Sequence, residues 1–296
     1  MLRWIIIASV SMFLFIVDAA PARADEKSKT VSEAGRVKLL KTFVSEFVAI
    51  TPGKGKFPRS FQMGSTSGTD SEQPVHKVTL AHSFSIAKYE VPQNLYEAVM
   101  GSNPSQWKGP RNSAEMFSWK EARSFCEKTT RLLRDANLIG KNEEIRMPTE
   151  AEWEYCCRAG TKTIYSFGDS ATKDGDKDKQ ASILDEYGWH TGNASGNDPP
   201  VGAKKPNQWG LYDTYGYLWE FVADEWHDSY KAAPSDGSCW SEDNDAKHRV
   251  MRGGAWTDRY EKLTSSYRMR VASDFRSPAV GLRCVKASVR KSKSEK

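Results

Sequence analysis

From Thr51 onward, glycine and proline interrupt the sequence every few residues, and this punctuation restricts the fold more than any other feature. Proline removes a backbone donor and glycine weakens regular elements, so long helices and long strands need runs free of both. The sequence therefore predicts short elements joined by many loops. Ten tryptophans are present, and large rigid side chains of this kind bury area where regular elements cannot.

Short apolar runs indicate extended segments at 57–63, 75–80 and 84–89. Upstream of them, Val37, Leu40, Phe43 and Phe47 recur at helical spacing, which predicts a short amphipathic helix over 36–49.

Two helices are marked by capping boxes, in which a hydroxyl and a glutamate three residues later satisfy each other's backbone N–H groups. Ser118 and Glu121 open one of them, and apolar positions after it predict a helix over 119–135. Thr149 and Glu152 open the other, and Gly160 is placed to end it. Beyond Gly160 the sequence predicts mostly loop.

The N-terminus has the pattern of a secretory signal peptide. A positive residue, Arg3, precedes an apolar run over 4–17, and small residues end in Ala22-Arg23-Ala24. We expect cleavage after Ala24, hence a secreted or periplasmic protein with no membrane span after cleavage. The alternative is an uncleaved anchor, which the well-placed cleavage motif disfavours. Residues 25–50 are then expected to be a polar linker followed by the short helix.

The net charge of +5 is concentrated at the two ends of the chain. Residues 1–24 carry +1 and residues 286–296 carry +4, so the body over 25–285 is neutral. A neutral body offers no electrostatic surface for nucleic acid, and no nucleic-acid partner is expected. The last residues, 288–296, are expected to be a basic disordered tail.

Five cysteines are present, at 126, 156, 157, 239 and 284. An exported protein meets oxidising conditions in which disulfides form, and the odd number leaves at least one thiol unpaired within the chain. Spacing alone fixes no pairing.

Eight short motifs occur in a fixed order along the chain. They are Phe61–Ser65, Glu72–Val78, Lys88–Val91, Met147–Tyr155, Pro206–Asp213, Leu218–Phe221, Arg252–Trp256 and Gly281–Cys284. In this order and spacing the chain resembles the sulfatase-modifying-factor, or formylglycine-generating-enzyme, family over residues 51–287. The resemblance implies an α+β fold: a single C-type-lectin-like domain with many loops and little regular secondary structure. Fold does not by itself give function.

The catalytic cysteines of that family are missing here. Its oxidases convert a sulfatase cysteine to formylglycine with O₂ and a copper(I) ion held by two thiolates. With Arg252-Gly253-Gly254 and Ser266–Arg270 as anchors, the two cysteine positions fall on Asp258 and Ser266. Hard oxygen atoms do not replace two thiolates for a soft monovalent metal, so no catalytic residue and no copper site are expected. The family also has a serine that lines the substrate groove directly after the two glycines, and Ala255 occupies that position here.

The resemblance instead implies a polar binding groove in which family substrates would lie. Its expected residues are Ala255, Trp256, Asp258, Arg259, Ser266, Tyr267, Arg268 and Arg270. We therefore expect a non-catalytic binding or accessory module for a peptide, protein or glycan partner. The alternative is a protein-modifying oxidoreductase that converts a sulfatase cysteine to formylglycine. A purely structural envelope protein is a third interpretation, which the lack of heptads and repeats disfavours.

Two further sites are implied by the resemblance. Asp213, Gly216, Leu218 and Glu220 match the ligands of a structural calcium ion, and carboxylates with backbone carbonyls suit that ion. The alternative is that the two carboxylates cap or salt-bridge a loop. Cys157 and Cys284 match a family disulfide, the alternative being two buried thiols.

Overall fold

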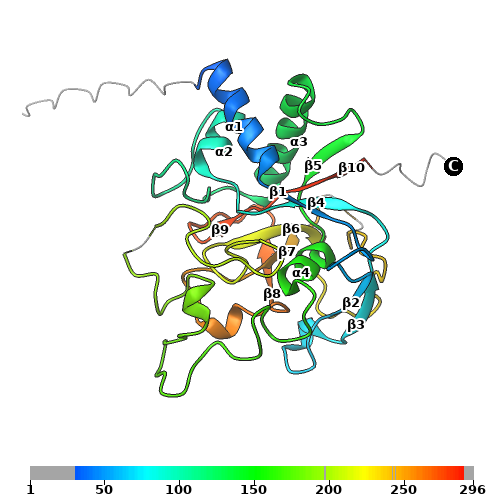
Figure 1. The fold of residues 1–296 in the computed structure, drawn as a ribbon, viewed down its shortest axis with the longest axis vertical. Coiled ribbons are helices and arrows are strands. Elements are labelled where there is room, and N and C mark those ends of the chain that lie inside the picture. The colour runs from blue at the N-terminus through cyan, green and yellow to red at the C-terminus, as the bar shows by residue number, and fades with distance from the viewer. Residues whose placement is uncertain (1–30, 197, 242, 244, 290–296) are drawn as a thin grey trace, which may run out of the picture.

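The computed structural model describes residues 31–289 except 197, 242 and 244 (Figure 1). The expected signal peptide over 1–24 and most of the expected tail lie outside the described residues. Within the described part of the chain, no helix is both long enough and apolar enough to cross a membrane.

Four α-helices form within the described residues, and two of them begin where their capping boxes predicted. They are α1 (Glu33–Ser45), α2 (Gln93–Met100), α3 (Trp119–Asp135) and α4 (Glu150–Arg158). Ser118 accepts from the Glu121 amide and Thr149 from the Glu152 amide, and both boxes are complete. The predicted range of α3 is confirmed. Helix α4 ends at Arg158, and its C-cap is Ala159, one residue before the predicted Gly160; Ala159 adopts a left-handed conformation with φ of 49°.

The first helix differs from its prediction. It begins at Glu33, with Ser32 as the N-terminal cap, and ends at Ser45. Phe47, expected on the apolar face of this helix, instead begins strand β1 (Phe47–Ile50), which pairs with β4 (Phe84–Ala87). Strand pairing therefore overrides the helical pattern, and residues 47–50 belong to the sheet and not to the expected segment of linker and helix over 25–50. Helix α2 was not predicted, although Pro92 and Gly101 bracket it.

The first sheet joins distant parts of the chain in the order β1-β4-β10-β5. Its remaining strands are β5 (Glu143–Arg146) and β10 (Val285–Ser288), and all its pairs are antiparallel. Ser288 was predicted to begin the disordered tail but pairs with Glu143. Figure 1 shows α1, α2 and α3 together on one side of this sheet.

A second sheet, which the sequence analysis missed, lies on the other side of the first (Figure 1). Its order is β8-β7-β6-β9, formed by β6 (Trp219–Glu225), β7 (His248–Arg252), β8 (Arg268–Ala272) and β9 (Val280–Gly281). The expectation of mostly loop beyond Gly160 is wrong for these strands, because four successive residues of β6 are buried and show no alternation. Strands β2 (Ser60–Met63) and β3 (His76–Thr79) form a separate two-stranded ribbon.

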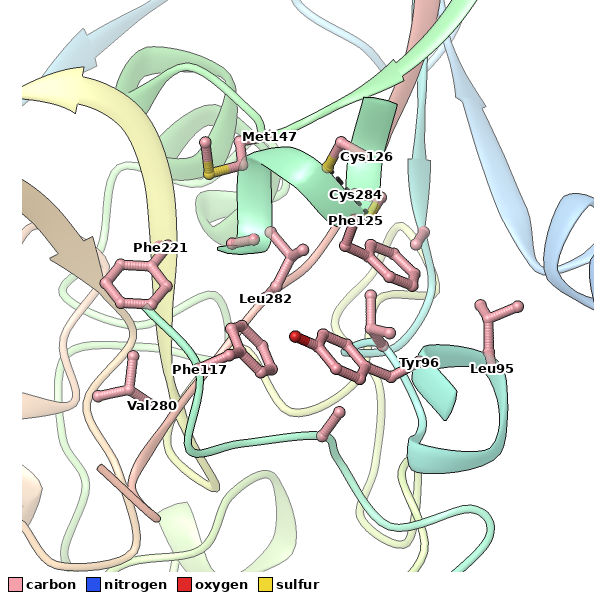
Figure 2. Close-up of a cluster of buried hydrophobic side chains, with 14 of the residues drawn as sticks. Leu95, Tyr96, Phe117, Phe125, Cys126, Met147, Phe221, Val280, Leu282 and Cys284 are labelled. Carbon is pink, nitrogen blue, oxygen red and sulfur yellow. Dashed lines mark hydrogen bonds between the residues drawn. The ribbon is translucent and has the colours of Figure 1, made fainter. Parts of the chain in front are cut away.

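The largest apolar cluster lies between the helices and the two sheets. Figure 2 shows its centre, where Tyr96 from α2 stacks on Phe117 and Phe125, with ring centroids 4.8 and 5.4 Å apart. Phe221 of β6 and Leu282 complete the same cluster. Aromatic side chains thus fill the space between short elements, as the tryptophan-rich, loop-rich sequence predicted.

Candidate functional site

The eight residues expected to form one groove do not share one surface. Ser266 and Tyr267 line a cavity of about 990 Å³, which we call the Ser266 cavity. Arg270 lines a second hollow of about 770 Å³, and Trp256 lines a third of about 370 Å³, the Trp256 cavity. The prediction of a single groove floor is therefore corrected. Closeness in sequence does not give these residues a shared surface, because Ser266 and Tyr267 precede strand β8, Arg270 lies within it, and Trp256 lies in a separate loop.

The Ser266 cavity is rich in neutral hydroxyl groups. They come mainly from the loop after β2 and the loop after α4: Ser65, Thr66, Ser67, Thr69, Thr161, Thr163 and Thr264. Lys77, Lys162 and Glu261 add charges, while Phe61 and Tyr155 add apolar wall. This mixture can exchange many hydrogen bonds with a polar ligand, and it offers apolar area beside them.

The carboxylate of Asp258, the residue expected at the first family cysteine position, is occupied by donors from its own chain. The Trp219 indole Nε1 donates to Oδ2 at 2.7 Å, and the Ala255 amide donates to the same oxygen at 3.3 Å. The Lys262 ammonium lies 3.1 Å from Oδ1. A built-in cation therefore sits on the carboxylate, and the Asp258 side chain is only 11% exposed.

Ser266, at the second cysteine position, is buried. Its carbonyl accepts from Arg252 at 2.9 Å, so a buried guanidinium fixes the backbone here. The neighbouring Tyr267 is half-buried, and its ring centroid lies 6.0 Å from that of Trp219. The indole of Trp219 thus contacts both Asp258 and the ring of Tyr267, the residue after Ser266.

The three predicted groove arginines have different surroundings. Arg268 is buried and ion-paired with Glu150, with the Tyr230 ring 4.3 Å away. Arg259 is exposed and pairs with Asp178 and Glu261, and Arg270 is exposed and contacts His248. Of the three, Arg268 is therefore part of the internal framework and unavailable to a ligand. Arg259 and Arg268 are therefore members of arginine–carboxylate pairs and not walls of one groove.

A buried charge network holds strands β7 and β8 against α4. Arg268 donates to both oxygens of Glu150, at 2.7 and 2.8 Å, and Tyr230 donates to Glu150 at 3.0 Å. Arg252 lies 3.3 Å from Glu150 and 2.6 Å from Glu154. Despite burial, the two guanidinium groups hold the pKa of Glu150 below its usual range. Glu150 and Glu154 of α4 therefore also position the strands that carry Arg252 and Arg268.

The predicted disulfide between Cys157 and Cys284 is not formed in the structure, and this is a correction. All five cysteines are described and all are free thiols. Cys157 on α4 packs in a different cluster and donates its thiol to the Thr214 carbonyl at 3.6 Å. Cys284 instead faces α3, with its Sγ 4.0 Å from that of Cys126 (Figure 2). The pairing of β10 with β4 and β5 places Cys284 in the cluster that contains α3.

The four predicted calcium ligands lie on the turn before β6 and at its start. Asp213 is buried; the Gly202 amide donates to its Oδ2 at 2.7 Å, and its Oδ1 has no hydrogen-bond partner among the described residues. Glu220 is already engaged: Arg283 lies 2.6 Å from its Oε1, and Trp153 donates to its Oε2 at 2.7 Å. Among the described residues, no three His, Cys, Asp or Glu side chains are arranged to hold a metal ion together.

Glu90 is a carboxylate near Asp213 and Glu220 that sequence reasoning did not single out. We call Glu90, Asp213 and Glu220 the Asp213 cluster. Glu90 is buried, and the Leu218 amide donates to its Oε1 at 3.1 Å. Burial together with the carboxylates of Glu220 and Asp213 raises its pKa well above the usual range. Burial likewise raises the pKa of Asp213 to about 6. Three carboxylates therefore lie near one buried guanidinium, that of Arg283. The cluster has more carboxylates than guanidinium groups, and this excess of acidic groups suits a cation.

Comparison with known proteins agrees with the fold. A protein-family model, FGE-sulfatase, described as the sulfatase-modifying factor enzyme 1-like domain, matches residues 38–288. Chaperone protein LppX of Paenibacillus barcinonensis is 28% identical over 243 residues, covering 71% of this chain and 82% of LppX. Inactive C-alpha-formylglycine-generating enzyme 2 of Bos taurus is 30% identical over 185 residues, covering 58% of this chain and 50% of that protein.

The solved structure of PvdO from Pseudomonas aeruginosa superposes with a TM-score of 0.68 and 27% identity, covering 81% of this chain and 94% of PvdO. The α+β, C-type-lectin-like fold expected from the motifs is thus confirmed. The family includes proteins named as enzymes and proteins named as inactive. With a matching domain over nearly all of the described residues, this chain belongs to the sulfatase-modifying factor enzyme 1-like family.

Proposed function

We propose that this protein is an exported, non-catalytic binding or accessory module of its family. Its partner, a peptide, protein or glycan, would be contacted through the Ser266 cavity. One observation carries the proposal: the two family thiolate positions hold Asp258 and Ser266, whose side chains offer only oxygen. A soft monovalent metal needs sulfur ligands.

The surroundings of these two residues support the same conclusion. The Lys262 ammonium and the Trp219 indole already contact Asp258. A metal ion there would have to displace a resident positive charge from a carboxylate. The five thiols offer no substitute, because four of them lie buried in the core and Cys239 is alone at the surface. The hydroxyl-rich cavity beside Ser266 keeps the properties needed for binding a polar partner.

The purified protein is expected not to convert a cysteine-containing sulfatase peptide to its formylglycine form. The peptide would be incubated with protein, O₂ and copper(I), and its mass followed over time. The Formylglycine-generating enzyme of Streptomyces coelicolor, a relative 29% identical over 191 residues, is the positive control. A copper(I) titration of the same sample should show no tight stoichiometric site. Conversion at the control's rate would instead establish the alternative, a protein-modifying oxidoreductase.

We further propose that the Asp213 cluster binds a structural calcium ion. The unpartnered Oδ1 of Asp213 and the excess of carboxylates over guanidinium groups fit a hard divalent cation. Backbone carbonyls of Gly216 and Leu218 would complete the site. Glu220 would contribute by charge, since its oxygens are held by Arg283 and Trp153. The bound ion would neutralise buried acid and stabilise the turn that leads into β6.

Calcium is therefore expected to stabilise the protein against unfolding. A ligand present at 100 times its dissociation constant adds about 2.7 kcal/mol to the free energy of unfolding. The measurement is the thermal midpoint with calcium and with a chelator. Asp213→Asn should lose the increment, whereas Asp178→Asn, at an exposed acid paired only with a surface arginine, should keep it. Equal midpoints with calcium and with chelator would refute this site.

A further inference from the structure

The Trp256 cavity is separate from the Ser266 cavity, and no described residue lines both. Its volume is about 370 Å³, and it is built from the loop between α2 and α3, residues 194–196 with Asp198, and the segments that carry Tyr217, Trp256 and Pro278. Nothing in the proposed binding function uses it. Its composition is unusual for so small a space: aromatic walls, two carboxylates, and no lysine, arginine or histidine among the described lining residues.

Two tryptophans form the walls. Their ring centroids lie 5.6 Å apart, with the ring planes at 76°, so the two faces form a corner. Trp256 is fixed because its indole Nε1 donates to the Pro278 carbonyl at 3.3 Å. Trp107 is 42% exposed, one of the few large apolar side chains on the described surface. The face of a tryptophan carries negative potential and attracts a cation placed over it.

The buried carboxylate of Glu115 lines the same cavity and is 3% exposed. The Gln106 amide donates to its Oε1 at 2.5 Å. Its Oε2 is buried without a hydrogen-bond partner among the described residues. A buried acceptor left unpaired costs about 1–3 kcal/mol, so a ligand that brings an N–H donor to it gains binding free energy.

The second carboxylate, Asp198, is exposed at the side of the cavity. The Tyr217 hydroxyl donates to its Oδ1 at 3.2 Å, and the Asn112 amide group donates to its Oδ2 at 2.7 Å. These donors are neutral, so its negative charge is not cancelled by them. Two carboxylates beside aromatic faces favour a positive ligand and repel a negative one.

We infer that the Trp256 cavity is a binding site for a primary ammonium group, with Glu115 Oε2 accepting its N–H and the indoles of Trp107 and Trp256 facing its charge. An ammonium fits better than a guanidinium. A guanidinium is recognised best by two parallel acceptor oxygens, whereas Glu115 has one oxygen free. A quaternary ammonium has no N–H to offer that oxygen.

Benzylammonium is the probe, and binding to the full mature chain is measured by isothermal titration calorimetry. It should bind about tenfold more tightly than benzyl alcohol, which is neutral, and than benzyltrimethylammonium, which lacks an N–H donor. Trp107→Ala should weaken benzylammonium binding several-fold. The matched control is Phe275→Ala, at another exposed aromatic residue that lines none of the three cavities, and it should leave binding unchanged.

Glu115→Gln tests the acceptor, and it should bring the affinities for benzylammonium and benzyl alcohol together. Thermal midpoints of the variants show whether each remains folded, and Trp107→Ala keeps the test decisive if Glu115→Gln does not fold. Equal binding of the three probes, no binding at millimolar affinity, or unchanged binding by Trp107→Ala would overturn the inference. Each of these outcomes leaves the peptide-conversion test of the proposed function unaffected.

Discussion

Replacing Glu150 with glutamine is expected to destabilise the protein by about 3–5 kcal/mol. Glu150 pairs with Arg268 at 2.7 Å and Arg252 at 3.3 Å, and all three side chains are buried. Removing the carboxylate charge leaves Arg268 desolvated without its anionic partner. Natural domains are stable by about 5–15 kcal/mol, so this loss is a large part of the total.

Urea unfolding of the wild type and of Glu150→Gln measures the difference. Glu261→Gln is the matched control: Glu261 also pairs with an arginine, Arg259, but both side chains are about half exposed. Exposed pairs of this kind contribute about 0–1 kcal/mol, because water screens them and their side chains are mobile. If both variants unfolded at the same urea concentration, the framework role of Glu150 would be wrong.

Oxidation of Cys126 and Cys284 to a disulfide is expected to raise the free energy of unfolding by about 5 kcal/mol. The two Sγ atoms are 4.0 Å apart in the apolar core, so a small shift would bring them to bonding distance. The bond would close a loop from α3 to the residue before β10, which is more than half of the matched domain. A loop of that length greatly restricts the unfolded chain, which is the source of the stabilisation in the chain-entropy model.

The reaction needs an oxidant, and oxidised glutathione can take the two electrons and the two thiol protons, leaving as two molecules of reduced glutathione. Burial raises the pKa of Cys284 well above the usual range, so the thiolate is scarce and the reaction is expected to be slow. Peptide mapping without reductant identifies the link, and urea unfolding with and without dithiothreitol measures its effect. Cys126→Ser should abolish the increment and Cys157→Ser should retain it. A mapped link between Cys157 and Cys284 would contradict the structure.

The helices show how far local sequence determines structure in this protein. The boundaries of α3 and the start of α4 follow from hydroxyl–glutamate pairs three residues apart, whose partners all lie within one turn. Helix α1 was displaced from its predicted range because Phe47 pairs with Ala87 across the sheet. That pairing depends on residues 40 positions away, and no local pattern contains it.

The second sheet and the arrangement of the groove residues could not be predicted from local sequence, for the same kind of reason. Strand β6 is covered on both faces, so its apolar residues do not alternate with polar ones. Its sequence therefore lacks the alternating pattern of a half-buried strand. The motif that contains Arg268 and Arg270 was interpreted as one surface. In the structure β8 buries Arg268 against Glu150 and leaves Arg270 exposed, although the two residues lie on the same face of the strand. The difference comes from what covers each position, which is decided by the tertiary packing.

The sequence alone determined that the domain is short-elemented and loop-rich, where two helices begin, which family the motifs resemble, and that oxygen replaces sulfur at Asp258 and Ser266. Each of these depends on the type of a residue or on its near neighbours. Only the tertiary structure decided that Cys284 faces Cys126 and that Lys262 covers Asp258. It also decided that Glu90 joins Asp213 in an acidic cluster. The first and last of these contacts join residues more than 100 positions apart. All three are set by strand register and loop packing, which are global properties of the fold.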